Sequence, residues 1–161
     1  MRVPKVILCT LCLSCASMVG AGADESSAGF VRRTPEQIPW KDIPDGHGAQ
    51  LATLAGDPAG HGIYVQRVRF PPHVMDHPHW HPNDRYVTVL KGTWYAGTGT
   101  IFDPARAVPM KPGSYMLHPA HAVHWDGSNT DEEVIVQIVG LGPADTVQQD
   151  PSQPFWVQLK P

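Results

Sequence analysis

Histidine is the residue type in this sequence that offers the most chemistry. Nine histidines occur in 161 residues, and seven of them fall between His73 and His124. His79 and His81 are two positions apart, so in an extended chain their imidazoles point to the same side, about 6–7 Å apart. Two imidazoles placed in this way can converge on one metal ion. A third ligand then has to come from a distant strand facing the same interior, and His124 is well placed to supply it.

Four further histidines flank the predicted ligands: His73, His77, His118 and His121. We expect these side chains to lie at the rim of the site or beside its ligands rather than on the ion. His77 is the best additional candidate because it shares the alternation of His79 and His81. The alternative for the whole set is a histidine-rich loop that scavenges metal at the surface or is simply solvated.

The segments that must position these side chains are short and strand-like. Prolines and glycines punctuate the sequence from residue 24 onward, and no helical periodicity extends beyond about two turns. The runs between turn signals that are predicted as strands are Gln50–Ala55, Ile63–Phe70, Tyr86–Leu90, Thr93–Ala96, Tyr115–Leu117, Ala122–Trp125, Val134–Val139 and Phe155–Leu159. Short strands separated by frequent turns are typical of an all-β sandwich or small barrel.

Two of these runs carry more specific predictions. Thr93–Ala96 is expected to form a hairpin with Tyr86–Leu90, because a lysine-glycine turn separates them. Val134–Val139 is apolar on both faces, as in a central strand of a barrel, apart from Gln137, whose amide needs partners if it is buried. Ala144–Pro154 is predicted to be a loop that leads to a final edge strand.

The first 23 residues have the three-part pattern of a secretory signal peptide. Arg2 and Lys5 give a positive start, and residues 6–19 form an apolar stretch that is shorter than a membrane span of about 20 residues. Ala21-Gly22-Ala23 then offers a cleavage site. We therefore expect a periplasmic or secreted protein. The alternatives are a first strand or an anchoring helix, and a lipoprotein anchored at Cys15.

Cleavage after Ala23 would leave one domain of ordinary size without cysteine, because Cys9, Cys12 and Cys15 all precede it. A disulfide, a thiolate metal site and a cysteine nucleophile are then excluded. The remaining chain has a net charge of −5 and no basic run, which argues against nucleic acid as a partner. Residues 24–45 are polar and proline-rich and are predicted to form an extended arm, and residues 46–161 the β-barrel domain.

The histidines fall into two clusters, residues 73–81 and 118–124, and both clusters resemble sequence motifs of the cupin superfamily. The two stretches that carry the likeness are His79-x-His81-x3-Arg85-x6-Gly92 and Pro112-x6-Pro119-x4-His124. The resemblance, which covers residues 63–139, implies a single-domain cupin fold, a double-stranded β-helix or jelly-roll barrel. It also places His79, His81 and His124 on the family's three metal-binding histidine positions.

Arg85 departs from the family motif, which usually has a glutamate ligand at this position. Arginine cannot bind a cation, so the resemblance implies a three-histidine site with open positions for one divalent transition metal (iron, nickel, copper or zinc), as in the thiol-dioxygenase branch. With Arg85 inside the barrel, the site would carry three positive charges, and a small organic anion would have to balance them. We expect Arg85 to clamp that anion, unless it turns outward and pairs with Asp84 or Asp76.

Further side chains are assigned to the site by their types and positions. The candidate catalytic residues are Arg85, Tyr95 and His121, and the candidate lining residues are Trp80, Tyr86, Tyr95 and Gln137. Each lining candidate could instead be a packing residue, and packing is the favoured role for Trp80, Trp94 and Trp125. Asp126 lies two positions after His124 on the same face, where it can orient an imidazole or simply open a turn.

Two classes of function follow from these assignments. The first is a mononuclear metal-dependent, oxygenase-like enzyme that acts on a small organic anion. The second is a non-catalytic cupin that senses a small molecule or holds a metal. Three methionines near the histidines, Met75, Met110 and Met116, would favour Cu(I), although methionine more often fills a core. The resemblance also implies a homodimer through edge strands, and Phe155-Trp156-Val157 is a candidate edge.

Overall fold

The computed structural model describes residues 29–160, and the chain divides into two compact units, Met1–Gln37 and Ile38–Pro161. The described part of the first unit contains a short 3-10 helix, η1 (Pro35–Gln37), preceded by Thr34, whose backbone N–H donates to the Gln37 side chain at 2.9 Å. The predicted signal peptide and the three cysteines lie outside the described residues. Within the described range, no helix is long and apolar enough to cross a membrane.

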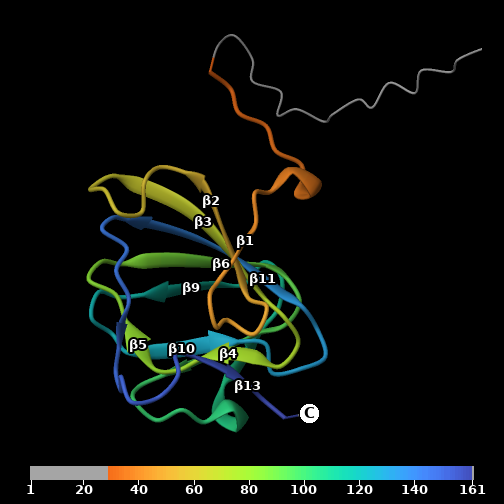
Figure 1. Ribbon diagram of the computed structural model, residues 1–161, viewed down its shortest axis with the longest axis vertical. Helices are drawn as coiled ribbons and strands as arrows, with labels where there is room; N and C mark the ends of the chain where they lie inside the picture. Colours follow the sequence, from red (N-terminus) through yellow and green to blue (C-terminus); the bar gives the residue numbers. More distant parts are fainter. Residues whose placement is uncertain (1–28, 161) are drawn as a thin grey trace, which may run out of the picture. The chain divides into compact units, whose positions relative to one another are not determined.

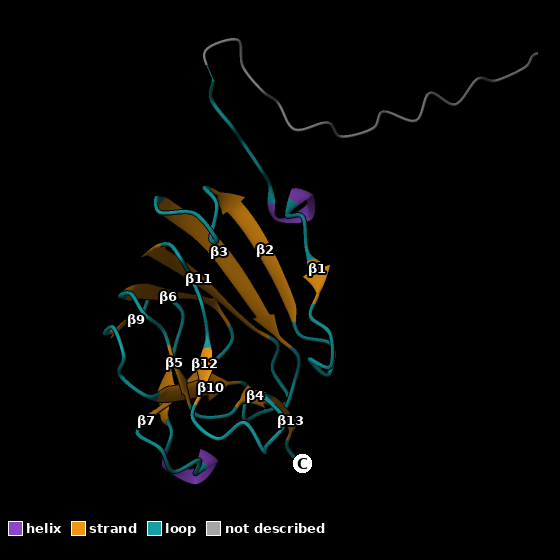
Figure 2. Cartoon of the chain, turned by 60° about the vertical axis from the view of Figure 1, so that its left-hand side comes forward, coloured by secondary structure: helices purple, strands orange, loops and turns teal. Residues whose placement is uncertain are grey.

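The second unit is built from two antiparallel sheets (Figures 1 and 2). The first sheet has the strand order β1-β2-β3-β11-β6-β9, with β1 (Lys41–Asp42), β2 (Gln50–Ala55), β3 (Ile63–Phe70), β11 (Val134–Leu141), β6 (Arg85–Lys91) and β9 (Tyr115–His118). The second sheet has the order β12-β5-β10-β4-β13, with β12 (Val147–Gln148), β5 (His79–Trp80), β10 (His124–Gly127), β4 (Val74–Asp76) and β13 (Trp156–Gln158). It also includes β7 (Trp94–Thr98), which pairs with β10 and with β8 (Val108–Met110). A 3-10 helix, η2 (Pro104–Arg106), precedes β8.

The prediction of an all-β jelly-roll fold is confirmed, and each predicted strand overlaps an observed one. The loop before β13 and the edge position of β13 are also as predicted, except that the loop contains β12. The strands that the sequence did not indicate are β1, β4, β5, β8 and β12, and each has only two or three residues. Runs this short contain no repeat of the strand alternation, so the pattern cannot reveal them. β1 falls inside the range 24–45 that was predicted as an arm.

The predicted hairpin between Tyr86–Leu90 and Thr93–Ala96 is wrong. β6 pairs with β11 and β9 in the first sheet, whereas β7 pairs with β10 and β8 in the second. Gly92 makes this crossing possible, because its φ is 68° and a Cβ there would lie 2.3 Å from the Glu133 carbonyl oxygen. The crossing carries β7 into the opposite sheet.

β11 is the central strand of the first sheet, as predicted, and pairs along its whole length with β3. Its inward residues, Val134, Val136 and Ile138, are buried in the main core. Gln137 lies on the outer face instead, where its side-chain oxygen accepts a hydrogen bond from Arg67 Nε at 3.1 Å. The amide therefore has its partner, and Gln137 does not face the interior.

One row of side chains crosses the inner face of the first sheet at its polar end. The strand registers place Tyr64, Gly140, Arg85 and His118 side by side on β3, β11, β6 and β9. Gly140 is required in this row because a Cβ there would lie 2.6 Å from the Tyr64 hydroxyl oxygen. Its missing side chain gives the Tyr64 ring the space that it occupies between β3 and β6.

Candidate metal centre

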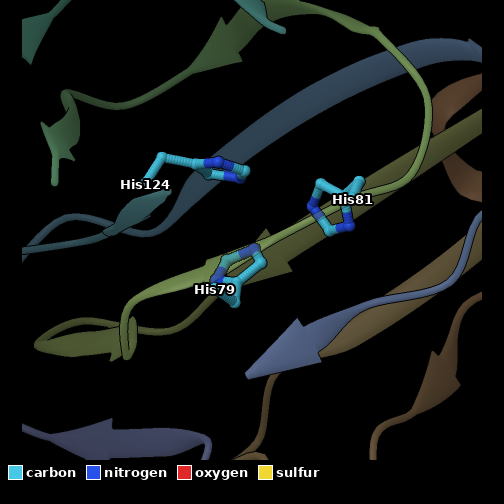
Figure 3. Close-up of side chains that lie close together, drawn as sticks. All are labelled: His79, His81 and His124. Atoms are coloured by element: carbon cyan, nitrogen blue, oxygen red, sulfur yellow. The ribbon is translucent and has the colours of Figure 1, made fainter. Parts of the chain in front are cut away.

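Three histidines come together on the inner side of the second sheet (Figure 3). His79 lies in β5, directly opposite His124 at the start of β10, and His81 follows β5. The ring centroid of His79 is 4.8 Å from that of His81 and 4.4 Å from that of His124. Their ligand atoms all lie within 4.8 Å of one another. The structure thus gathers the three residues that the sequence predicts as metal ligands.

Each of these imidazoles has one ring nitrogen fixed by the backbone. The Nδ1 atoms of His79, His81 and His124 lie 2.9 Å from the carbonyl oxygens of His77, Asp145 and Ala122, respectively. Because a carbonyl oxygen only accepts, Nδ1 carries the proton and Nε2 keeps its lone pair. His124 Nε2 is buried and has no hydrogen-bond partner among the described residues. Metal-ligating histidines have this same arrangement, so the site fits a metal ion.

Burial keeps the three imidazoles neutral, which is the form that binds a metal. It lowers the pKa of His81 to about 3 and that of His124 to about 4, and the positive charge of Arg85 adds to both shifts. The pKa of His79 is also well below its usual value, first because of burial and then because of His124. At neutral pH all three therefore present a free lone pair.

His118 belongs to the same site, and of the two predicted positions, at the rim or beside a ligand, it occupies the second. Its ring is buried and stacks on the His124 ring with a centroid distance of 3.7 Å. His118 Nε2 is a further buried atom without a described partner, and burial lowers the pKa of the ring to about 2. With Asp126, His118 forms a second potential metal-binding group that shares His124. The sequence contained one signal for this position. His118 follows Leu117 at the end of a predicted strand, and successive residues of a strand point to opposite faces, so His118 faces inward where Leu117 is exposed.

Two buried carboxyl groups stand behind the histidines. Asp126, predicted to orient an imidazole or to open a turn, lies within β10 and instead accepts a hydrogen bond from Trp94 Nε1 at 2.8 Å, while its backbone N–H donates to Asp76 Oδ1 at 2.7 Å. Asp76 Oδ1 lies 3.8 Å from His79 Nδ1. Burial raises the pKa of Asp126 to about 7, and burial together with Asp126 raises that of Asp76 well above its usual value. A nearby metal cation would favour the ionised form of both.

Arg85 points into the interior, so the outward alternative is wrong. Its Nη2 donates to the Ala144 carbonyl oxygen at 2.8 Å, and its Nε is buried without a described partner. Asp84 instead accepts from the Ala120 backbone N–H. Burial lowers the pKa of Arg85 and raises that of Tyr64, while each group partly offsets the shift of the other. The guanidinium is therefore held beside the histidines and against the Tyr64 side chain.

The two aspartates change the charge balance expected from the sequence. A divalent cation and Arg85 bring three positive charges, and Asp76 and Asp126 bring two negative ones when both are ionised. The sequence-based count omitted both aspartates. When a bound cation ionises both carboxyl groups, they leave less positive charge for an anionic ligand to balance.

These polar groups face a cavity of about 220 Å³. The volume is below the range of about 300–1,000 Å³ that is usual for drug-sized ligands, so the cavity suits a smaller molecule. Its lining comprises Ile43, Leu51, Pro58, Gln66, Val68, Phe70, Asp76, His81, Arg85, Val87, Trp94, His118, His124, Asp126, Val136, Ile138, Ala144, Thr146, Phe155 and Trp156.

Two of the three candidate catalytic residues do not line this cavity. Tyr95 lies on the outer face of β7, where it packs against the second core cluster, which includes Met75 and Trp125. Its inward neighbour Trp94 faces the site instead. His121 is exposed, has a φ of 63°, and places its ring 4.8 Å from that of Trp80. Of the three candidates, only Arg85 reaches the site.

Other predicted lining groups also lie elsewhere. The His77 ring packs against Phe102 at 4.6 Å, and its Nδ1 lies 2.6 Å from the Pro154 carbonyl oxygen. Tyr86 is 46% exposed, and neither Trp80 nor Gln137 lines the cavity. The three methionines that could have favoured Cu(I) are also outside it: Met75 in the second core cluster, and Met110 and Met116 along a separate groove. Methionine ligation at this centre is therefore not supported.

Substitution of Gly140 by alanine is expected to destabilise the protein by about 1–3 kcal/mol, because the new methyl group overpacks the row beside Arg85. The Tyr64 hydroxyl oxygen would be 2.6 Å away, and the ring, only 1% exposed, cannot swing out to solvent. Urea unfolding measures the loss. In a Tyr64→Phe background, which lacks the hydroxyl oxygen, Gly140→Ala should cost less stability than it does in the native protein. Equal losses in the two backgrounds would contradict this account.

The comparisons with known proteins agree with this architecture. A family model described as Cupin matches residues 58–160. No functionally curated protein matches the sequence significantly. Similar solved structures include the polyketide cyclase RemF from Streptomyces resistomycificus, with 15% identity, a TM-score of 0.64, and coverage of 76% of this chain and 87% of RemF.

Two further structures show the same fold at similar distances. The DMSP lyase DddQ from Ruegeria pomeroyi DSS-3 has 16% identity and a TM-score of 0.59, and the match covers 73% of this chain but only 64% of the lyase. KdgF from Halomonas sp. has 17% identity and a TM-score of 0.53, with 68% and 93% of the two chains covered. Likenesses at this level of identity establish the fold alone. Together with the family match over most of its length, they show that this chain belongs to the cupin family.

Proposed function

We propose that this protein is an exported, metal-dependent enzyme, oxygenase-like in its chemistry, that acts on a small organic anion. The observation that carries the proposal is the convergence of three imidazoles, each with Nδ1 fixed by a backbone carbonyl, beside a cavity that His81, His124 and Arg85 line. Export rests on the N-terminal sequence pattern.

The roles of the residues follow from their positions. His79, His81 and His124 would hold one divalent transition metal and leave coordination positions open, at which the metal supplies Lewis-acid or oxygen-binding chemistry. Arg85 would bind and orient the anion from the cavity wall. The buried setting excludes bulk water, which strengthens the attraction between the anion and Arg85.

Two observations favour an enzyme over a passive sensor. His118 offers a buried, neutral imidazole beside the ligand His124, in addition to the three groups needed to hold the ion. Two of the structural neighbours are also named as enzymes, a cyclase and a lyase. The metal and the reaction of this protein remain part of the proposal.

Elemental analysis of the purified, untagged protein tests the proposal. We expect about one equivalent of iron, nickel, copper or zinc per chain, and almost none in a His124→Ala variant. Losing a residue that only supports a ligand already lowers metal affinity by about 10–100-fold, and losing a direct ligand should lower it further. His61→Ala is the matched control, since His61 is exposed and distant from the cavity lining. Equal metal contents in the native protein and His124→Ala, or no metal in the native protein after reconstitution, would refute the metal centre.

A further inference from the structure

The cavity has one polar and one apolar end. In the first sheet, the row with Arg85 and His118 is followed by rows that become progressively apolar toward Phe70. The next row contains Gln66, Ile138 and Val87, and the one after it Val68 and Val136. All of these residues line the cavity, so a ligand held at the polar end must extend along an aliphatic wall.

The opposite wall continues this apolar surface. Trp156 of β13 lines the cavity and packs against Phe70 with a ring-centroid distance of 5.7 Å. Ile43 and Leu51, from the β1–β2 region, complete the same end. Two surface grooves share residues with this end: one shares Ile43 and Leu51, and the other shares Trp156. The apolar end therefore approaches the surface at these grooves.

The charged and titratable lining groups gather around the histidines, and none of them belongs to the aliphatic rows of β3, β6 and β11. They are Asp76, His81, Arg85, His118, His124 and Asp126. A second charge on the ligand would have to enter the aliphatic rows, where no described side chain could pair with it, and that burial is costly.

We propose that the ligand is a monocarboxylate with an apolar tail. The carboxylate lies at the metal centre beside Arg85, and the tail runs along Val68 and Val136 toward Ile43 and Trp156. This inference rests on the proposed function, because it assumes the anion site, and it adds the chemical class of the molecule that the site accepts.

Calorimetric titration of the metal-loaded protein with acetate, butyrate, hexanoate and octanoate tests the inference. Each added methylene that is fully buried should strengthen binding by about fourfold, and the gain should end where the tail reaches solvent. Adipate, which has the length of hexanoate but a second carboxylate, should bind at least about tenfold more weakly than hexanoate.

Ile43→Ser and Ile63→Ser form a matched pair for the same titration. Ile43 lines the apolar end, whereas Ile63 is 67% exposed and lies outside the cavity lining. Ile43→Ser should weaken hexanoate binding several-fold more than acetate binding, and Ile63→Ser should bind the whole series like the native protein.

The possible failures are distinct. If acetate binds but affinity is flat or falls with chain length, or if adipate binds as tightly as hexanoate, the apolar-tail inference is wrong and the anion site stands. If no carboxylate binds to the metal-loaded protein, the anion site of the proposed function is wrong as well, and the inference is lost with it.

Discussion

Replacing Arg85 by methionine is expected to weaken carboxylate binding by about 100-fold or more. A hydrogen bond to a charged group contributes about 1.5–3 kcal/mol, and a guanidinium can make two such bonds to one carboxylate. A loss of about 3–4 kcal/mol corresponds to about 100–1,000-fold in the dissociation constant. Calorimetric titration of the metal-loaded variant with hexanoate measures the change.

The same variant is expected to bind its metal ion several-fold more tightly in the absence of carboxylate. The charge of Arg85 helps to lower the pKa of His81 and of His124, and the same repulsion acts on a cation held by these rings. Competition with a chelator measures the metal affinity. A purely structural role of Arg85 would weaken both kinds of binding, so effects of opposite sign separate the two explanations.

Arg67→Met is the matched control for this experiment. Arg67 lies on the outer face of the first sheet, where it hydrogen bonds to Gln137, and it does not line the cavity. Both affinities should equal those of the native protein. If Arg85→Met binds carboxylates as tightly as Arg67→Met does, Arg85 does not contact the anion.

The metal-free protein is expected to lose about 2–3 kcal/mol of stability per pH unit as the pH falls from about 6 to about 5. The pKa values of His79, His81, His118 and His124 are all depressed in the folded state, so only the unfolded chain takes up protons on these groups. Their contribution to stability is complete above the unfolded pKa of about 6.5 and is lost as the pH falls toward the folded values.

Asp76 and Asp126 oppose this effect without cancelling it. Their pKa values are raised, so in the same pH range the folded protein binds protons on two carboxyl groups that are ionised in the unfolded chain. The net difference is about two protons in favour of the unfolded state, which sets the expected slope. Urea unfolding in the presence of a chelator at pH 7, 6 and 5 measures it.

A His118→Leu variant provides the comparison for the pH experiment. It removes one of the four buried imidazoles without touching a predicted primary ligand, so it should reduce the slope by about one proton equivalent. Stability that is independent of pH in the native metal-free protein, or that increases on acidification, would show that these imidazoles are not neutral and buried as described.

The sequence was sufficient for the parts of the site that follow strand alternation over a clear motif. His79 and His81 share a face because they are two positions apart, and His124 supplies the distant partner. Asp126 was found for the same reason, as the next inward residue after His124. The fold class also followed, because long strands such as β3 and β11 carry enough residues to show their pattern.

Errors arose where the chain changes sheets or turns. Gly92 sends β7 into the second sheet, so the site meets Trp94 and not Tyr95. His121 lies in a turn with a positive φ, and the alternation of side chains between two faces, which holds in a strand, does not apply there. Asp76 was missed because all three residues of β4 are buried, which leaves no contrast between its two faces. Pairing with β10 and β13 causes that burial, and neither partner is adjacent in sequence.

The support for the three ligand histidines comes from main-chain atoms, and this affects how the site can change over time. A side-chain partner is lost by one substitution, but the carbonyl oxygens of His77, Asp145 and Ala122 survive any replacement of those residues that leaves the backbone in place. The orientation of the imidazoles is thus encoded in the path of the chain. Point changes at Asp145 or Ala122 should be tolerated, whereas inserting or deleting a single residue there would misalign the rings. The site therefore tolerates substitutions at the residues that supply these carbonyl groups, but it is sensitive to changes in loop length.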